Sequence, residues 1–277
     1  MHNAFLKTTP QVMAILNVTP DSFSDGGLLF KGSAINNGLL LDTVAQLVTD
    51  GADIIDVGGE STRPGASAVA VQEELDRVLP AVEAIKANFD VAVSVDSSTP
   101  EVMTGSALLG ADMLNDVRAF TREGALAAAA NSQLPICIMH MQGTPNTMQI
   151  SPQYDDVCSE ILDFLIARRA DAVIEGVAAE RVWLDPGFGF GKTLEHNLDL
   201  MRHLPKLAEE APLLIGVSKK RMIGDVTGRD VDERVVGSAL FGYHALQNGA
   251  RILRVHDVKS TRDAIATFIA LDQPEYK

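Results

Sequence analysis

Residues 91–96 read VAVSVD, a short apolar run that ends on a carboxylate, Asp96. A continuous apolar run of this length is typical of a strand buried on both faces of a parallel sheet. Seven similar runs also end on a polar or ionisable residue, and their spacing along the chain is nearly regular. The full set is Val12–Asn17, Ile54–Glu60, Val91–Asp96, Met113–Asp116, Pro135–His140, Val182–Asp185, Leu213–Ser218 and Ile252–His256.

Segments with helical spacing of apolar residues lie between these runs. The stripes expected to face the core are Leu40, Val44, Leu47 and Val48; Leu75, Val78, Leu79, Val82 and Ile85; Ile161, Leu162, Leu165, Ile166 and Val173; Leu194, Leu198, Met201 and Leu204; and Val235, Val236, Ala239, Leu240 and Tyr243. Eight alternations of strand, loop and helix are most simply closed as a (β/α)8 TIM barrel. A doubly wound open sheet stays as the alternative, because periodicity does not separate the two. Without a linker or compositional break, we expect one domain over residues 1–277.

Composition narrows the class of protein. The 277 residues are 46% hydrophobic, and the formal net charge is −14. This acidic balance argues against nucleic acid or an anionic membrane surface as a partner. The two cysteines, Cys137 in a strand run and Cys158 at the start of a helix, lack metal-type spacing and indicate a reducing compartment. With no apparent signal peptide or spanning segment, we expect a soluble cytoplasmic protein.

The carboxyl ends of the strands are where the site is expected, because the βα loops of a TIM barrel form the active site there. Two of these connections are longer than a βα turn needs, namely residues 18–37 and residues 58–70. Loops of this length and glycine content are commonly lids or binding loops, with ordinary surface loops as the alternative.

Two long motifs in these connections resemble the dihydropteroate synthase family. Residues 15–27 read ILNVTPDSFSDGG and residues 56–65 read DVGGESTRPG, which are similar to that family's two signatures. Further matches follow in the same order at residues 94–96, 115–116, 139–143, 184–192 and 254–257. The resemblance implies condensation of a dihydropterin pyrophosphate with p-aminobenzoate, with Mg²⁺ as cofactor and a homodimer as the assembly.

The family motifs imply a site for the pterin ring. Asp96, Asn115 and Asp185 would read the ring's polar edge, and Asp96, Asp185 and Lys220 would be the catalytic groups. Asp and Asn at strand-to-helix turns also serve as helix N-caps, and for Asp116 we expect that structural role. The resemblance places the pterin against Asp96, Asn115, Val117, Met139, Asp185, Phe190, Gly216, Lys220 and Arg254.

The pyrophosphate requires cations and hydrogen-bond donors. Arg254 and His256 are two residues apart in one strand, so their side chains share a face. The resemblance adds Asn17 as a Mg²⁺ ligand, and one amide oxygen with substrate phosphates is ordinary Mg²⁺ chemistry. Thr62 and Arg63 complete the implied pyrophosphate site.

The implied p-aminobenzoate pocket comprises Phe23, Thr62, Pro64, Lys220 and Arg221. Here the chain departs from the family, which more often reads Ser-Arg-Lys followed by Ser or Arg at residues 218–221. In this sequence Lys219, Lys220 and Arg221 oppose the dipole of the following helix, which favours an anionic or polar ligand nearby. A solvated basic face is the alternative for Lys219 and Arg221.

The sequence also bears on three other functions: nucleotide binding, non-catalytic or methyl-transfer pterin binding, and aldol cleavage. Residues 191–193 resemble the end of a P-loop, but the position of its first glycine is Pro186, and glycines 187, 189 and 191 lack dinucleotide spacing. A pterin-binding module related to methyltransferase domains is the nearest rival, but it would not need Arg254 and His256 for pyrophosphate. A sugar-phosphate aldolase would instead form a Schiff base between Lys220 and its carbonyl substrate.

Overall fold

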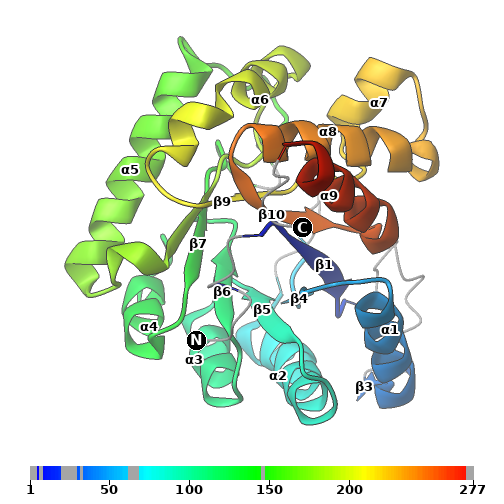
Figure 1. Cartoon of the computed structure of the whole chain (residues 1–277). Helices are drawn as coiled ribbons and strands as arrows, with labels where there is room; N and C mark the ends of the chain where they lie inside the picture. The colour runs from blue at the N-terminus through cyan, green and yellow to red at the C-terminus, as the bar shows by residue number, and fades with distance from the viewer. Residues whose placement is uncertain are drawn as a thin grey trace.

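The eight apolar runs form eight parallel strands in the computed structural model of the chain (Figure 1). The strands are β1 (Gln11–Asn17), β4 (Ile54–Gly58), β5 (Ala92–Asp96), β6 (Met113–Asp116), β7 (Ile136–Met139), β8 (Val182–Asp185), β9 (Leu213–Ile215) and β10 (Ala250–Val255). They pair in sequence order from β4 to β10, and β1 closes the circle between β10 and β4. The sheet is therefore the predicted TIM barrel and not an open doubly wound sheet. The structure describes residues 5, 9–19, 30–31, 34–61, 69–144 and 147–272.

Helices surround the barrel and follow each of its strands (Figure 1). They are α1 (Asn37–Thr49), α2 (Val71–Asn88), α3 (Pro100–Leu108), α4 (Ala125–Ser132), α5 (Val157–Glu175), α6 (Leu194–Ala208), α7 (Arg221–Thr227), α8 (Val235–Gln247) and α9 (Val258–Asp272). Short 3₁₀ turns, η2 (Ala179–Arg181) and η3 (Val231–Glu233), precede β8 and α8. No helix in this described part of the chain is both long and apolar enough to cross a membrane.

An antiparallel strand pair lies in the first long connection, β2 (Phe30–Lys31) with β3 (Ala34–Ile35). Residues 18–37 were predicted to be a loop without strands, and the hairpin is therefore a correction to that prediction. Strands of two residues are too short to produce a periodic apolar signal.

The amino-terminal part of the barrel interior is an apolar layer. Each of the eight strands contributes one buried side chain to it, and Phe5 packs beneath, with its ring 6.3 Å from that of Trp183 in an edge-on contact. This layer closes that end of the barrel, so a ligand can enter only from the carboxyl ends of the strands. Its members are Phe5, Met13, Ile54, Ala92, Met113, Cys137, Trp183, Leu214 and Ile252.

A second apolar core lies between the barrel and its helices, and parts of two predicted stripes do not belong to it. Ile166 and Val173 on α5 are 37% and 43% exposed, and Val236 and Leu240 on α8 are 70% and 65% exposed. The face that α8 buries includes the small residues Ser238, Gly242 and Ala245. A Cβ on Gly242 would lie 3.1 Å from Leu253, so the helix packs close to β10 through small residues rather than through its large apolar ones.

Candidate active site

The barrel interior becomes polar two residues beyond the apolar layer. Side chains two apart on a strand point to the same side, so this second layer faces inward like the first. Its carboxylates and amide are almost fully buried and therefore need partners. Listed by strand, the layer comprises Ile15, Asp56, Ser94, Asn115, Met139, Asp185, Gly216 and Arg254.

Arg254 on β10 lies between two carboxylates. Its Nε donates to Oδ2 of Asp56 at 2.6 Å, and its Nη2 donates to Oδ2 of Asp96 at 2.8 Å. Burial lowers the pKa of Arg254, but Asp56 and Asp96 outweigh it and raise the pKa, so this guanidinium stays charged. Oδ1 of Asp56 is buried without a hydrogen-bond partner among the described residues. The orientation of Arg254 is thus set by two strands, β4 and β5.

The pKa of Asp96 is raised to about 7, chiefly because burial disfavours the charged form. Arg254 lowers it, while Asp56, Asp116 and Glu74 raise it. The carboxyl group of Asp96 therefore changes between its protonated and ionised forms near neutral pH. It lines the cavity described below.

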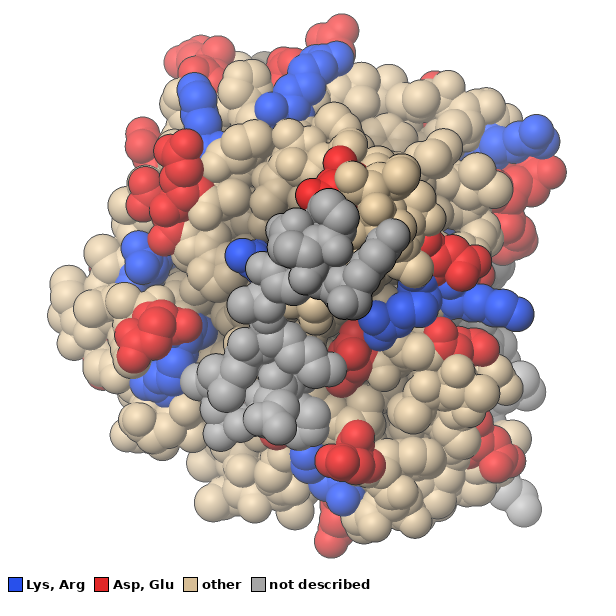
Figure 2. Space-filling view, viewed as in Figure 1, with Lys and Arg blue, Asp and Glu red and all other residues tan. Residues whose placement is uncertain are grey.

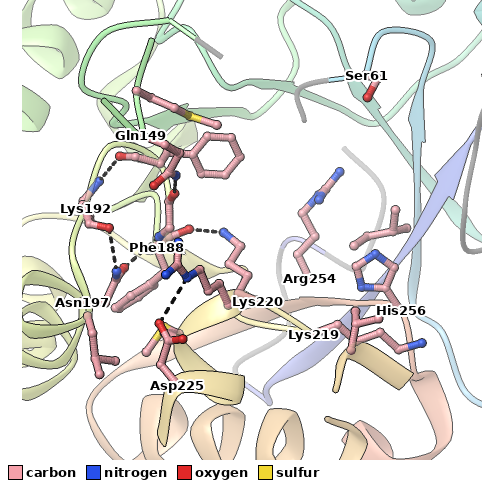
Figure 3. A pocket seen from close by; sticks show the side chains of 18 of the residues that line it. Ser61, Gln149, Phe188, Lys192, Asn197, Lys219, Lys220, Asp225, Arg254 and His256 are labelled. Atoms are coloured by element: carbon pink, nitrogen blue, oxygen red, sulfur yellow. Dashed lines mark hydrogen bonds and ion pairs between the residues drawn. The ribbon is translucent and has the colours of Figure 1, made fainter. Parts of the chain in front are cut away.

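Lys220 lies across the barrel from this cluster, just before α7. Its ammonium donates to the carbonyl of Phe188 and lies 4.6 Å from the centre of the Phe190 ring (Figure 3). Burial lowers its pKa to about 8, although the charge of Asp185 acts in the opposite direction. Asp185 itself accepts from the Gly187 amide at 2.7 Å, and burial raises its pKa.

A cavity of about 850 Å³ opens above these residues. Figure 3 shows Arg254 and His256 on one side of it and Lys220 with Phe188 on the other. Seven predicted site residues line it, namely Asn17, Asp96, Phe190, Lys220, Arg221, Arg254 and His256. Five more are buried at or just beyond the strand ends but are not among its lining residues, namely Asn115, Val117, Met139, Asp185 and Gly216.

His256 and Asn17 occupy the rim of the cavity. Oγ of Ser218 accepts from the His256 backbone N–H at 3.2 Å and lies 3.2 Å from Nδ1 of its ring. A Cβ on Gly58 would lie 3.6 Å from Oδ1 of Asn17 and 3.8 Å from Asp96. Gly58 thus lies beside both the amide oxygen of Asn17 and Cβ of Asp96 at the rim.

Four predicted residues of the pyrophosphate and p-aminobenzoate sites are not among those that the structure describes, namely Phe23, Thr62, Arg63 and Pro64. Of the implied p-aminobenzoate pocket, Lys220 and Arg221 are described. The Arg221 side chain is 87% exposed and lies 3.5 Å from Asp225.

Asp116 has a structural role, but it does not cap a helix. Its carboxylate accepts from the backbone amides of Arg118 and Phe120, at 2.8 and 2.7 Å, and from the Ser98 hydroxyl. It therefore holds the turn after β6, whereas α4 begins later, at Ala125. The prediction of helix N-capping was wrong, because a β-turn and a helix start use the same carboxylate–amide bonds.

Three residues of the site region were not singled out from the sequence. Asp56 belongs to the second signature but received no role, and Glu60 forms a two-point ion pair with Arg118 at 2.7 and 3.0 Å. Lys192 was considered only as part of a false P-loop. A charged residue inside an otherwise apolar strand run, as at Asp56, is the signal that could have identified the first of them.

Charge on the molecular surface is mixed. On the face seen in Figure 2, lysine and arginine side chains alternate with aspartate and glutamate, and we see no large basic patch among the described residues. Positive charge is instead local to the cavity, where Lys219, Lys220 and Arg254 line the wall.

Comparison with known proteins agrees with this geometry. The family model for pterin binding enzymes matches residues 13–256. The dihydropteroate synthase of Escherichia coli is 49% identical over 276 residues, covering 97% of this chain and 95% of that protein. A Yersinia pestis dihydropteroate synthase solved with a sulfonamide drug complex has a TM-score of 0.90 at 48% identity, covering 96% of this chain and 95% of that one. The Xanthomonas albilineans enzyme in complex with 7,8-dihydropteroate has a TM-score of 0.84 at 42% identity, covering 96% and 94% of the two chains. The chain therefore belongs to the dihydropteroate synthase family of pterin binding enzymes.

Proposed function

We propose that this chain condenses 6-hydroxymethyl-7,8-dihydropterin pyrophosphate with p-aminobenzoate, forming 7,8-dihydropteroate and pyrophosphate. It is then a transferase of folate biosynthesis, and the curated Escherichia coli relative is named dihydropteroate synthase. The observation that carries the proposal is an ion pair in the cavity: Asp96 and Arg254 both line it, and Nη2 of Arg254 donates to Oδ2 of Asp96 at 2.8 Å.

The pterin ring is proposed to bind in the polar second layer. Asp96, Asn115 and Asp185 offer carboxylate and amide groups to the donors and acceptors of the ring edge. Val117, Met139 and Phe190 supply apolar surface, and Gly216 leaves space beside Arg254, 3.8 Å from where a Cβ would stand. Two buried carboxylates with raised pKa gain hydrogen-bond partners when the ring binds, which favours their ionised forms.

The bond between the pterin methylene and the pyrophosphate is proposed to break because the site stabilises the charges that form on both groups. Loss of pyrophosphate from the pterin methylene leaves cationic character on the ring, and Asp96 and Asp185 stabilise that charge in a water-poor site. Arg254 and His256 stabilise the departing pyrophosphate, and we assign Thr62 and Arg63 to the same task. The amine of p-aminobenzoate then attacks the methylene carbon, forming the C–N bond and releasing its proton. No covalent enzyme intermediate is required.

A Mg²⁺ ion is proposed to accompany the pyrophosphate. The described residues contain no group of three His, Cys, Asp or Glu side chains that could hold a metal ion alone. They do fit a cation held mainly by substrate phosphates, since Asn17 presents an amide oxygen to the cavity beside Gly58. When bound, Mg²⁺ would neutralise charge on the leaving pyrophosphate.

The arylamine is proposed to bind at the start of α7, near Lys220 and Arg221, with Phe23, Thr62 and Pro64 on its other side. The guanidinium of Arg221 is exposed, and its one ion pair among the described residues is with Asp225, at 3.5 Å, so it can turn towards the carboxylate of p-aminobenzoate. Lys219 also lines the cavity and adds positive charge.

The experiment is incubation of the purified chain with dihydropterin pyrophosphate, p-aminobenzoate and Mg²⁺, with pyrophosphate and dihydropteroate both quantified. Release of pyrophosphate that depends on the amine, with an equal amount of dihydropteroate, is the expected result. Pterin binding without that release would instead support a pterin-binding module and would remove the proposal.

We further propose that the single barrel domain spans residues 1–277 and acts as a cytoplasmic homodimer. Val236 and Leu240 are one turn apart on α8 and 70% and 65% exposed, an apolar face that a second copy could cover. Analytical ultracentrifugation should give twice the chain mass for the wild type. A Leu240→Glu variant should shift towards the monomer, and a wild-type monomer at micromolar concentration would contradict the proposal.

A further inference from the structure

Lys192 is a buried lysine next to the cavity that the proposed mechanism does not use. Lys192 is only 4% exposed to solvent. Its Nζ lies 3.0 Å from Nδ1 of His140 and donates to the carbonyls of Gly187, at 2.8 Å, and Phe190, at 3.0 Å. Burial lowers the pKa of Lys192 well below its usual range, although the charge of Asp185 acts in the opposite direction. In its protonated form the amine has three N–H donors, and here three acceptors receive them. None is left for a substrate.

The imidazole of His140 suits this arrangement. Burial first, and the charge of Lys192 second, lower the pKa of His140 to about 3. The ring is therefore neutral at physiological pH, and the tautomer that carries its proton on Nε2 presents Nδ1 as an acceptor. Its position is fixed by an edge-on contact with Phe164, with ring centres 5.0 Å apart.

The loop that Lys192 holds, residues 187–191, carries both contacts of Lys220. The carbonyl of Phe188 accepts from the Lys220 ammonium, and the Phe190 ring lies 4.6 Å from it. The loop is seated tightly on the end of β7: a Cβ on Gly187, whose φ is +68°, would lie 1.9 Å from the carbonyl oxygen of His140. Only glycine can adopt that position.

Neutral groups hold the outer side of the same loop. Gln149 and Tyr154 donate to the carbonyls of Gly189 and Gly191, at 2.6 and 2.9 Å, and Oδ1 of Asn197 accepts from the Gly189 amide at 2.7 Å. Figure 3 shows Asn197, Lys192 and Phe188 together on the side of the cavity opposite His256. Lys192 holds the inner side of the loop, since its side chain joins His140, at the end of β7, to both Gly187 and Phe190.

We propose that Lys192 is a positioning residue for the pterin site: it holds the loop of residues 187–191 so that Phe190 and the Phe188 carbonyl fix Lys220 beside the ring. The proposal rests on the proposed function, because it assigns Lys220 and Phe190 to the pterin. It predicts that loss of the ammonium weakens pterin binding without removing any direct contact to substrate.

The test compares Lys192→Met, which keeps the length of the side chain but has no donors, with Lys192→Gln, which keeps two N–H donors. The dissociation constant for dihydropterin pyrophosphate is measured by calorimetry in the presence of Mg²⁺. It should rise about tenfold or more in Lys192→Met and less in Lys192→Gln. The KM for p-aminobenzoate should rise less than the pterin dissociation constant, because the loop holds Lys220 but not Arg221, the other described residue assigned to that pocket. Lys206→Met, on the exposed side of α6, is the matched control and should behave as the wild type.

Pterin affinity within about twofold of the wild type in both variants, whatever their melting temperatures, would overturn the proposal. So would equal losses for both substrates, since these would indicate general loosening of the barrel. If Lys192→Met does not fold, the Lys192→Gln variant decides by the same comparison. Wild-type activity is measured first, so that an inactive wild type contradicts the proposed function, whereas an active wild type with unaffected variants contradicts only the role of Lys192.

Discussion

The Nε of Arg254 donates to Oδ2 of Asp56 at 2.6 Å, an ion pair between residues 198 positions apart in the chain. Asp56 is fully buried, and the Arg254 side chain is 22% exposed. The guanidinium of Arg254, which we assign to the pyrophosphate, is therefore held by Asp56, a carboxylate buried beyond the reach of substrate. A buried charge pair of this kind contributes little to stability but fixes the orientation of its members.

Replacement of Asp56 by Asn should lower kcat/KM for dihydropterin pyrophosphate about 10- to 100-fold, because Arg254 loses a charged acceptor and shifts towards Asp96. Steady-state kinetics with p-aminobenzoate at saturation measures this. Asp53→Asn is the matched control on the same segment, since Asp53 pairs with Arg262 outside the site. Equal effects of the two substitutions would contradict a role for Asp56 in positioning Arg254.

The Asp96→Asn variant should slow turnover far more than it weakens pterin binding. The carboxylate stabilises charge that develops only as pyrophosphate leaves, whereas Asn keeps a hydrogen-bonding group of the same shape. We expect kcat to fall at least about 100-fold, with less than about tenfold change in pterin affinity. Rapid-quench kinetics and calorimetry measure the two quantities, and losses of similar size would count against the mechanism.

The pH dependence of kcat/KM should be bell-shaped. Burial raises the pKa of Asp96 to about 7, so its carboxylate, and with it activity, appears as the pH rises through 7. Burial lowers the pKa of Lys220 to about 8, so its ammonium is lost as the pH rises further. Activity should therefore be highest between the two values. In Asp96→Asn the acid limb should disappear, and a wild-type profile that stays flat from about pH 6 to 9 would refute the assignment.

Arg221 should affect the arylamine and not the pterin. Because its side chain is 87% exposed and paired only loosely with Asp225, Arg221→Ser should raise the KM for p-aminobenzoate about two- to fivefold. Asp225→Asn should lower the same KM by releasing the guanidinium. Arg229→Ser, which removes another exposed arginine, is the control. An unchanged KM in both Arg221→Ser and Asp225→Asn would place the carboxylate of the substrate elsewhere.

Much of the fold could be predicted from local patterns. Each apolar run became a strand, because continuous apolar character reflects burial on both faces. The bounds agree within two residues except at β9, which ends at Ile215 and not at the predicted Ser218. The predictions for α5 and α8 were less accurate. The outer helices of a barrel bury a narrow stripe, and on α8 small residues occupy it while Val236 and Leu240 remain exposed.

By itself, the sequence determined that eight strands alternate with helices, that a polar residue lies at or within three residues of the end of each strand, and that two long signatures resemble one family. The tertiary structure alone decided which groups meet. Closure of the sheet brings β10 beside β1 and places Arg254 between Asp56 and Asp96, and the packing of β7 against β8 puts Lys192 in contact with His140. Periodicity reports the burial of each segment. The pairing of charges depends on the register and closure of the barrel, which is a property of all eight strands together.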